Sequence, residues 1–154
     1  MKRLLFFSLF VLFFVLTPQI KAGDYLDRVE ESVVALRGPN KRIFCSGFVV
    51  DSKQEYIQTA FHCMEFAYMQ GADVYVDEKK VRLVAFVSKY DIAIIQAKNN
   101  RPHLKPTRRR IQVGMQLTAI GYAEGLQKPT FKATEVVAIE EFEKARERLT
   151  FIDA

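Results

Sequence analysis

The chain has 154 residues, enough for one domain or two small halves, and its 49% hydrophobic content excludes a disordered protein. The formal charge is +5, but Lys2, Arg3 and Lys21 lie in a segment that we expect to be removed after export. Without these three, 20 basic residues face 18 acidic ones, a balance that argues against nucleic acid as a partner.

The N-terminus has the pattern of a secretory signal. Lys2 and Arg3 precede an apolar run from Leu4 to Leu16, and Ala22 supplies a small residue for cleavage. The apolar run is about 13 residues, against roughly 20 for a membrane-spanning helix. We therefore predict a signal peptide over residues 1–22 and a secreted or periplasmic protein with no stable membrane association after cleavage. An uncleaved anchor is the alternative.

Two cysteines, Cys45 and Cys63, are the only ones in the chain. In an exported protein an even count favours a disulfide, and two free buried thiols are the alternative. The spacing lacks a Cys-x-x-Cys pair and offers too few ligands for a structural zinc site. No phosphate loop or dinucleotide motif is present either. The sequence thus predicts neither a metal nor a cofactor.

Between the signal and residue 97 the pattern predicts short strands joined by turns. A short helix is expected to begin at Asp24, and local helical potential occurs at 64–69. Strands are expected over 32–36, 43–50, 56–59, 73–76, 81–87 and 91–96. Six short strands at this spacing are typical of an all-β barrel or sandwich.

The polar, proline-containing stretch 98–110 predicts a linker. A second β unit follows, with strands expected over 116–120, 131–139 and 149–152. The charged segment 140–148 is compatible with either a short helix or an exposed hairpin arm. His103 lies in the linker and is expected to be a solvent-exposed residue.

His62 and Asp91 are the candidates for chemistry. His62 follows a predicted strand, where a loop would expose it, and histidine is suited to proton transfer near neutral pH. Asp91 opens an apolar strand 29 residues later, and a buried carboxylate without a partner is costly. A hydrogen bond to His62 would supply that partner. Taken singly, a histidine beside a cysteine can be structural and an aspartate before a strand can be a turn cap.

Several motifs together resemble the trypsin-like (chymotrypsin-fold) serine proteases. FCSGFVV, from Phe44, is similar to the family's first cysteine strand. TAFHC, Thr59–Cys63, resembles Thr-Ala-Ala-His-Cys, with Phe61 in place of an alanine. DIAII, from Asp91, resembles Asp-Ile-Ala-Leu. The lead-in SVVAL and the stretch VGMQLTAIGYAEG resemble bacterial exported Do-like and glutamyl-endopeptidase-like members.

The resemblance implies an all-β, chymotrypsin-like double β-barrel with a short N-terminal helix. Residues 23–97 would form the first barrel, 98–110 a linker and 111–154 part of the second barrel. It implies that His62 is the general base, that Asp91 orients it, and that a Cys45–Cys63 disulfide braces the histidine loop. The implied activity is serine endopeptidase hydrolysis of protein or peptide substrates through an acyl-enzyme.

The family's nucleophile motif, Gly-Asp/Asn-Ser-Gly-Gly, does not occur in the 154 residues. One hypothesis is a fragment of a serine protease, cut before the nucleophile. The alternative is a secreted non-catalytic homologue with a binding or regulatory role. A metal or nucleic-acid binding module is a third, weaker hypothesis. Because a partial barrel leaves strand edges open, residues 111–154 are expected to be less ordered or prone to aggregate.

Overall fold

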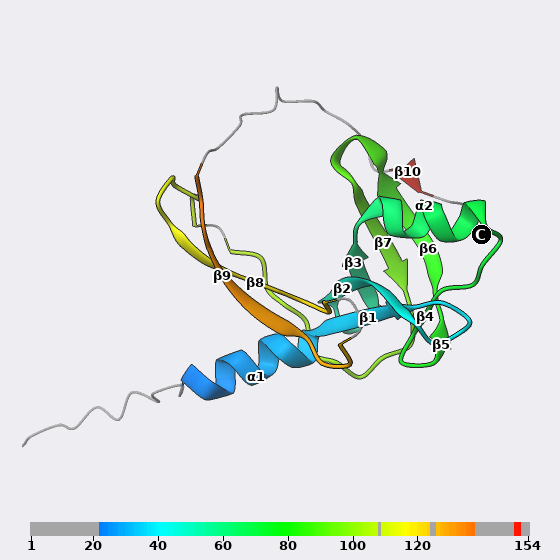
Figure 1. The fold of residues 1–154 in the computed structure, drawn as a ribbon, viewed down its shortest axis with the longest axis horizontal. Coiled ribbons are helices and arrows are strands. Elements are labelled where there is room, and N and C mark those ends of the chain that lie inside the picture. Colours follow the sequence, from blue (N-terminus) through cyan, green and yellow to red (C-terminus); the bar gives the residue numbers. More distant parts are fainter. Residues whose placement is uncertain (1–21, 108, 124–125, 138–149, 152–154) are drawn as a thin grey trace, which may run out of the picture.

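The computed structural model describes residues 22–107, 109–123, 126–137 and 150–151 (Figure 1). The predicted signal peptide, except for Ala22, lies outside this range, and so does the charged segment 140–148.

Across the residues that the structure describes, no helix combines the length and apolar character needed to cross a membrane.

The element order is that of a mostly β protein, as the sequence predicts. Helix α1 (Ala22–Ser32) leads directly into β1, with Asp24 in its first turn, where an acid interacts favourably with the helix dipole. The remaining elements are β1 (Val33–Arg37), β2 (Ile43–Asp51), β3 (Tyr56–Thr59), α2 (Phe61–Met69), β4 (Tyr75–Val76), β5 (Lys79–Lys80), β6 (Arg82–Val87), the 3₁₀ helix η1 (Ser88–Tyr90), β7 (Ile92–Gln96), β8 (Gln116–Gly121), β9 (Thr130–Glu135) and β10 (Thr150–Phe151).

The larger sheet has the strand order β10-β6-β7-β3-β2-β1-β4-β5, and every pair in it is antiparallel. The Val81 N–H donates to the Val74 carbonyl at 2.9 Å, which continues the β4–β5 hairpin at one end of the sheet. Strand β6, next to the other end, begins one residue later at Arg82, so the two ends of the sheet lie near each other. The sheet therefore curls on itself, as Figure 1 shows.

Alternate residues of the central strands fill the inside of this curl. Leu36, Val49, Ile57 and Ile95 are fully buried, as the two-residue side-chain period of a strand requires. Each such side chain contributes about 1.5–3 kcal/mol by leaving water. Gly47 in β2 leaves no room for a side chain, since a Cβ there would lie 2.9 Å from a backbone carbonyl of β3.

Strands β8 and β9 form a separate two-stranded sheet whose residues are mostly exposed. In the described ranges, hydrogen bonds from two residue pairs join the segment that follows β8 to the larger sheet. The Tyr122 N–H donates to the Ser46 hydroxyl in β2 at 2.8 Å, and the Arg37 guanidinium donates to the Gln127 side-chain oxygen at 3.1 Å. The predicted strand over 131–139 corresponds to β9, which ends at Glu135, and residues 138–139 lie outside the described range.

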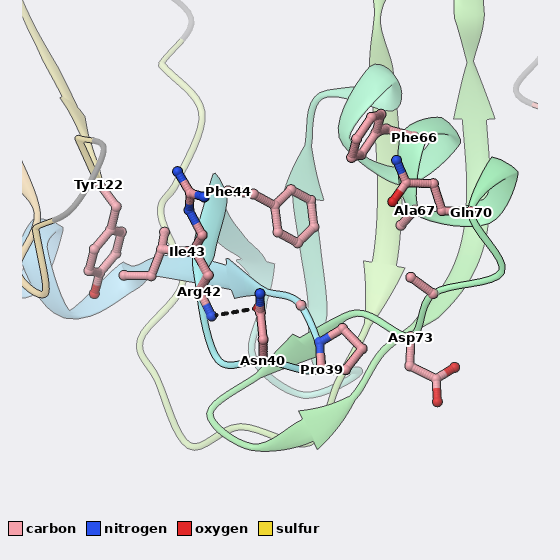
Figure 2. Close-up of a pocket in the computed structure, with 12 residues that line it drawn as sticks. Pro39, Asn40, Arg42, Ile43, Phe44, Phe66, Ala67, Gln70, Asp73 and Tyr122 are labelled. Carbon is pink, nitrogen blue, oxygen red and sulfur yellow. Dashed lines mark hydrogen bonds between the residues drawn. The ribbon is translucent and has the colours of Figure 1, made fainter.

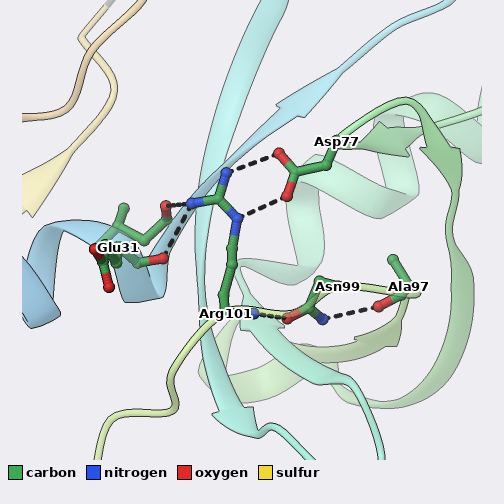
Figure 3. A network of polar contacts seen from close by, with 6 residues as sticks. Glu31, Asp77, Ala97, Asn99 and Arg101 are labelled. Atoms are coloured by element: carbon green, nitrogen blue, oxygen red, sulfur yellow. Dashed lines mark hydrogen bonds and ion pairs between the residues drawn. The ribbon is translucent and has the colours of Figure 1, made fainter.

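The predicted linker packs against the larger sheet. The Leu104 N–H donates to the Val49 carbonyl at 2.9 Å. Arg101 makes a two-pronged ion pair with Asp77 at 2.6 and 2.8 Å and donates to the Glu31 carbonyl at the end of α1 (Figure 3). This Arg101 clamp ties the linker, α1 and the β4–β5 turn together.

The last predicted strand, over 149–152, is described only at residues 150–151, which form β10. Thr150 and Phe151 pair with Phe86 and Ala85 of β6. The strand therefore extends the edge of the larger sheet, whereas the sequence pattern had grouped it with β8 and β9.

Candidate functional site

His62 lies in the first turn of α2, directly after β3. Ala60 is the extended residue that precedes the helix, so the chain leaves the sheet and turns into α2 within two residues. The sequence pattern placed this helix at 64–69, whereas α2 begins at Phe61. The histidine is therefore held by helix backbone and does not sit in a free loop.

Asp91 ends the short helix η1 and precedes β7. Its backbone is left-handed, with φ of +53°, a conformation that is uncommon outside glycine and that aspartate tolerates better than most residues. The strand itself begins at Ile92, so Asp91 stands just before it. The side chain points back to the start of α2.

Three hydrogen bonds join Asp91 to the start of α2. The imidazole Nδ1 of His62 lies 2.6 Å from Asp91 Oδ2, and the His62 backbone N–H donates to Oδ1 at 2.8 Å. The Phe61 N–H donates to the Asp91 main-chain carbonyl at 3.1 Å. A carboxylate accepts only, so the ring proton belongs on Nδ1 and Nε2 is left as the acceptor nitrogen.

The same contacts set the electrostatics of the pair. The pKa of Asp91 is lowered, first by the hydrogen bond from the His62 backbone N–H and then by the bond from the imidazole, because both stabilise the carboxylate. The side chains of His62 and Asp91 are 68% and 49% exposed. A substrate or partner molecule can therefore reach the imidazole from solvent.

A disulfide joins Cys45 of β2 to Cys63 of α2, with the two Cα atoms 6.2 Å apart. The predicted bridge is confirmed, and the alternative of two free thiols is excluded. Nε2 of His62 lies 3.5 Å from Cys63 Sγ. Three possible ligand atoms, one from His62 and one from each cysteine, all lie within 4.8 Å of one another. The two sulfurs are bonded to each other in this structure.

One cavity opens beside the histidine, and a second adjoins it through shared aromatic walls. One of about 440 Å³ is lined by His62, the disulfide, Glu65 and Met69, and by the rings of Phe44 and Phe66. A larger one of about 740 Å³ shares these two rings and runs on toward the loop 38–42 and Asp73. Figure 2 shows the Phe44 ring projecting from β2 toward α2, which carries Phe66.

The aromatic walls were not predicted. Phe44 is 37% exposed and Phe66 is 60% exposed, so both depart from the burial usual for phenylalanine. The alternation of β2 around the buried Ile43 and Val49 could have indicated that Phe44 faces outward. No comparable pattern marks Phe66, because α2 has apolar residues on every side.

The second histidine is not part of this site. Nδ1 of His103 lies 3.1 Å from the Ser52 hydroxyl, in the turn that precedes β3, whereas His62 follows the end of that strand. His103 is exposed, as expected. Across the described ranges, no serine or threonine hydroxyl forms a hydrogen bond with Nε2 of His62.

The trypsin-like peptidase domain family matches residues 45–154. Solved structures share the fold. Deg5 superposes with a TM-score of 0.61 at 19% identity, covering 77% of this chain and 63% of its own. The MamO protease domain from Magnetospirillum magneticum gives 0.56 at 18% identity, covering 73% and 64%. The serine endoprotease from Yersinia pestis gives 0.59 at 22% identity, covering 73% and 43%.

This chain spans less than two thirds of each of these three structures. Among the curated proteins, none matches its sequence. The superpositions bear out the predicted chymotrypsin-like fold, and the family match covers both cysteines, His62 and Asp91. The chain therefore belongs to the trypsin-like peptidase domain family.

Proposed function

We propose that this chain supplies the general base and its orienting acid to a serine endopeptidase site acting on proteins or peptides. His62 would accept the nucleophile's proton on Nε2 and return it to the leaving amine, and Asp91 would hold the ring tautomer. The observation that carries the proposal is the 2.6 Å contact between His62 Nδ1 and Asp91 Oδ2, which leaves Nε2 as the acceptor nitrogen of an exposed imidazole that lines one cavity.

The nucleophile and the oxyanion donors are not assigned to any of the 154 residues. A base without them contributes little to acyl transfer. We propose that residues 23–97 form the base-bearing barrel, that 98–110 connect it to a partial second barrel over 111–154, and that residues 1–22 direct export. The disulfide is in keeping with an oxidising compartment.

A non-catalytic homologue that binds proteins is the second candidate. It is favoured by the two exposed rings, Phe44 and Phe66, which flank cavities of about 740 and 440 Å³ whether or not a nucleophile is present. Apolar pockets rimmed by polar residues are typical binding surfaces. Under this hypothesis the protein binds a peptide segment but does not cleave it.

A fluorophosphonate probe, which reacts with activated serines, separates the two candidates. The protein is produced in its own host with whatever coding sequence follows residue 154, and labelling is read on a gel. Labelling of the wild type that is lost in His62→Gln supports the proposed base. The variant His103→Gln is the matched control, since this histidine lies at the other end of β3. A folded wild-type protein that does not label supports the binding homologue.

A further inference from the structure

We propose that reducing the Cys45–Cys63 disulfide converts the His62 site into a tetrahedral zinc site. The ligands would be the two cysteine thiolates and Nε2 of His62, with water in the fourth position. Two thiolates and an imidazole are the ligands that select zinc among the divalent ions of the first transition row. The three ligand atoms already lie within 4.8 Å of one another.

The backbone is spaced for this conversion. A disulfide holds two sulfurs about 2 Å apart. Two sulfurs on a tetrahedral zinc, each about 2.3 Å from the ion, lie about 3.8 Å apart. Each sulfur therefore has to move by about 1 Å, which rotation about the Cα–Cβ bonds can supply while the Cα atoms of Cys45 and Cys63 stay 6.2 Å apart.

The histidine is already arranged as a metal ligand. A zinc-bound imidazole usually donates its other ring N–H to a carboxylate, which fixes the tautomer and the ring orientation. Asp91 makes this contact with Nδ1 at 2.6 Å. Nε2 is the nitrogen that remains, and it lies on the sulfur side, 3.5 Å from Cys63 Sγ.

The surroundings also allow the ion to enter. The His62 side chain is 68% exposed, and the adjoining cavity of about 440 Å³ gives room for a water ligand. Cys63 lies in the first turn of the nine-residue helix α2, where the helix dipole favours negative charge. Cys63 itself is 4% exposed, so one side of the ion would be enclosed by protein.

The chemistry balances with a dithiol as the reductant. The dithiol gives up two electrons and closes to its own disulfide, the Cys45–Cys63 bond breaks, and each cysteine sulfur takes one proton. Zinc then displaces these two protons to the buffer as two zinc–sulfur bonds and one zinc–nitrogen bond form. No other reactant is needed.

Cobalt(II) is the probe, because tetrahedral thiolate coordination gives it charge-transfer absorption in the near ultraviolet and strong d–d bands in the visible. The wild-type chain is reduced with dithiothreitol, freed of reductant under nitrogen and titrated with Co²⁺ and then Zn²⁺. We expect these bands only in the reduced protein, and we expect Zn²⁺ to abolish them. The oxidised protein and Cys45→Ser are the controls.

Two further variants distinguish this site from zinc bound by thiols alone. His62→Gln should weaken zinc binding at least tenfold, whereas His103→Gln should leave it unchanged. Asp91→Asn, which keeps all three ligands, should weaken it by about 10- to 100-fold. Equal affinity in wild type, His62→Gln and Asp91→Asn overturns the proposal.

Folding of the reduced chain is followed by circular dichroism in the same titration. A reduced chain that keeps the native spectrum, or regains it on adding zinc, while showing the cobalt bands supports the site. A folded reduced chain without the bands, or one that zinc fails to restore, overturns it. Metal binding does not depend on the proposed protease function. The consequence for activity does depend on that function, because zinc on Nε2 would keep His62 from accepting a proton. Absence of the cobalt bands therefore contradicts the zinc site, whereas absence of fluorophosphonate labelling contradicts the protease function.

Discussion

Replacing Cys45 and Cys63 together with alanine should lower the free energy of unfolding by about 3 kcal/mol. The bridge joins residues 18 apart in sequence, and closing a loop of this length removes about 11 cal/mol/K of entropy from the unfolded chain. Alanine is the appropriate replacement, because Cys63 is buried and a serine hydroxyl there would need a hydrogen-bond partner. The magnitude is a large part of the 5–15 kcal/mol typical of a whole domain.

Urea unfolding followed by circular dichroism measures the loss. The matched control is the wild-type protein in dithiothreitol and a metal chelator, which breaks the bridge without changing the sequence and should lose a similar amount. A loss below about 1 kcal/mol, at an unchanged dependence on urea, would refute the reasoning. It would mean that the segment between β2 and α2 is already restricted in the unfolded chain, or that the bridge is offset by strain in the folded one.

Three further predictions concern other parts of the fold. Gly47→Ala should lower the free energy of unfolding by about 1–3 kcal/mol in urea, because the new Cβ would press on the β3 backbone. The control Gly38→Ala, whose Cβ would meet only a side-chain oxygen at 3.3 Å, should change it by less than about 0.5 kcal/mol. Equal effects would contradict the close packing of β2 on β3. Arg101→Lys should lower the free energy of unfolding by about 1–3 kcal/mol in the same assay, because an ammonium cannot make the two-pronged bond to Asp77 and the bond to the end of α1 at once. An unchanged urea midpoint would show that the Arg101 clamp does not stabilise the fold. Because the pKa of Asp91 is lowered in the folded protein, its carboxylate stabilises the fold above the pKa that it has in the unfolded chain, and this stabilisation is lost as the pH falls through the folded-state pKa. The thermal midpoints of wild type and Asp91→Asn should therefore differ most near neutral pH and converge in acid. Midpoints that differ by the same amount at every pH would count against the His62–Asp91 pair.

The strands and the site pair were accessible from sequence for a simple reason. Runs such as 43–50, 56–59 and 91–96 combine β-branched residues with turn signals, so their positions differ from β2, β3 and β7 by only a residue or so. The proximity of His62 and Asp91 was expected as well, although the burial on which that expectation rested is not found, because the Asp91 side chain is 49% exposed. The geometry agrees, with 2.6 Å between the two side chains.

Other features depend on contacts that leave no local pattern. The start of α2 at Phe61 was not predicted, because the apolar residues of this segment follow no helical period that would mark its first turn. The left-handed backbone of Asp91 accompanies its bonds to His62, which lies 29 positions earlier in the chain. The pairing of β10 with β6 joins segments more than 60 residues apart, and no short motif encodes such a partner.

Asp91 holds the start of α2 by two separable means. Its main-chain carbonyl accepts the Phe61 N–H, while its carboxylate accepts the two His62 hydrogens. Trimming the side chain would remove only the second of these. The imidazole would then lie next to a solvent-accessible cavity of the size of a carboxylate. A formate ion from the buffer can occupy this cavity. Position 91 therefore combines a side-chain contact that a small anion can replace with a backbone contact that does not depend on the side chain.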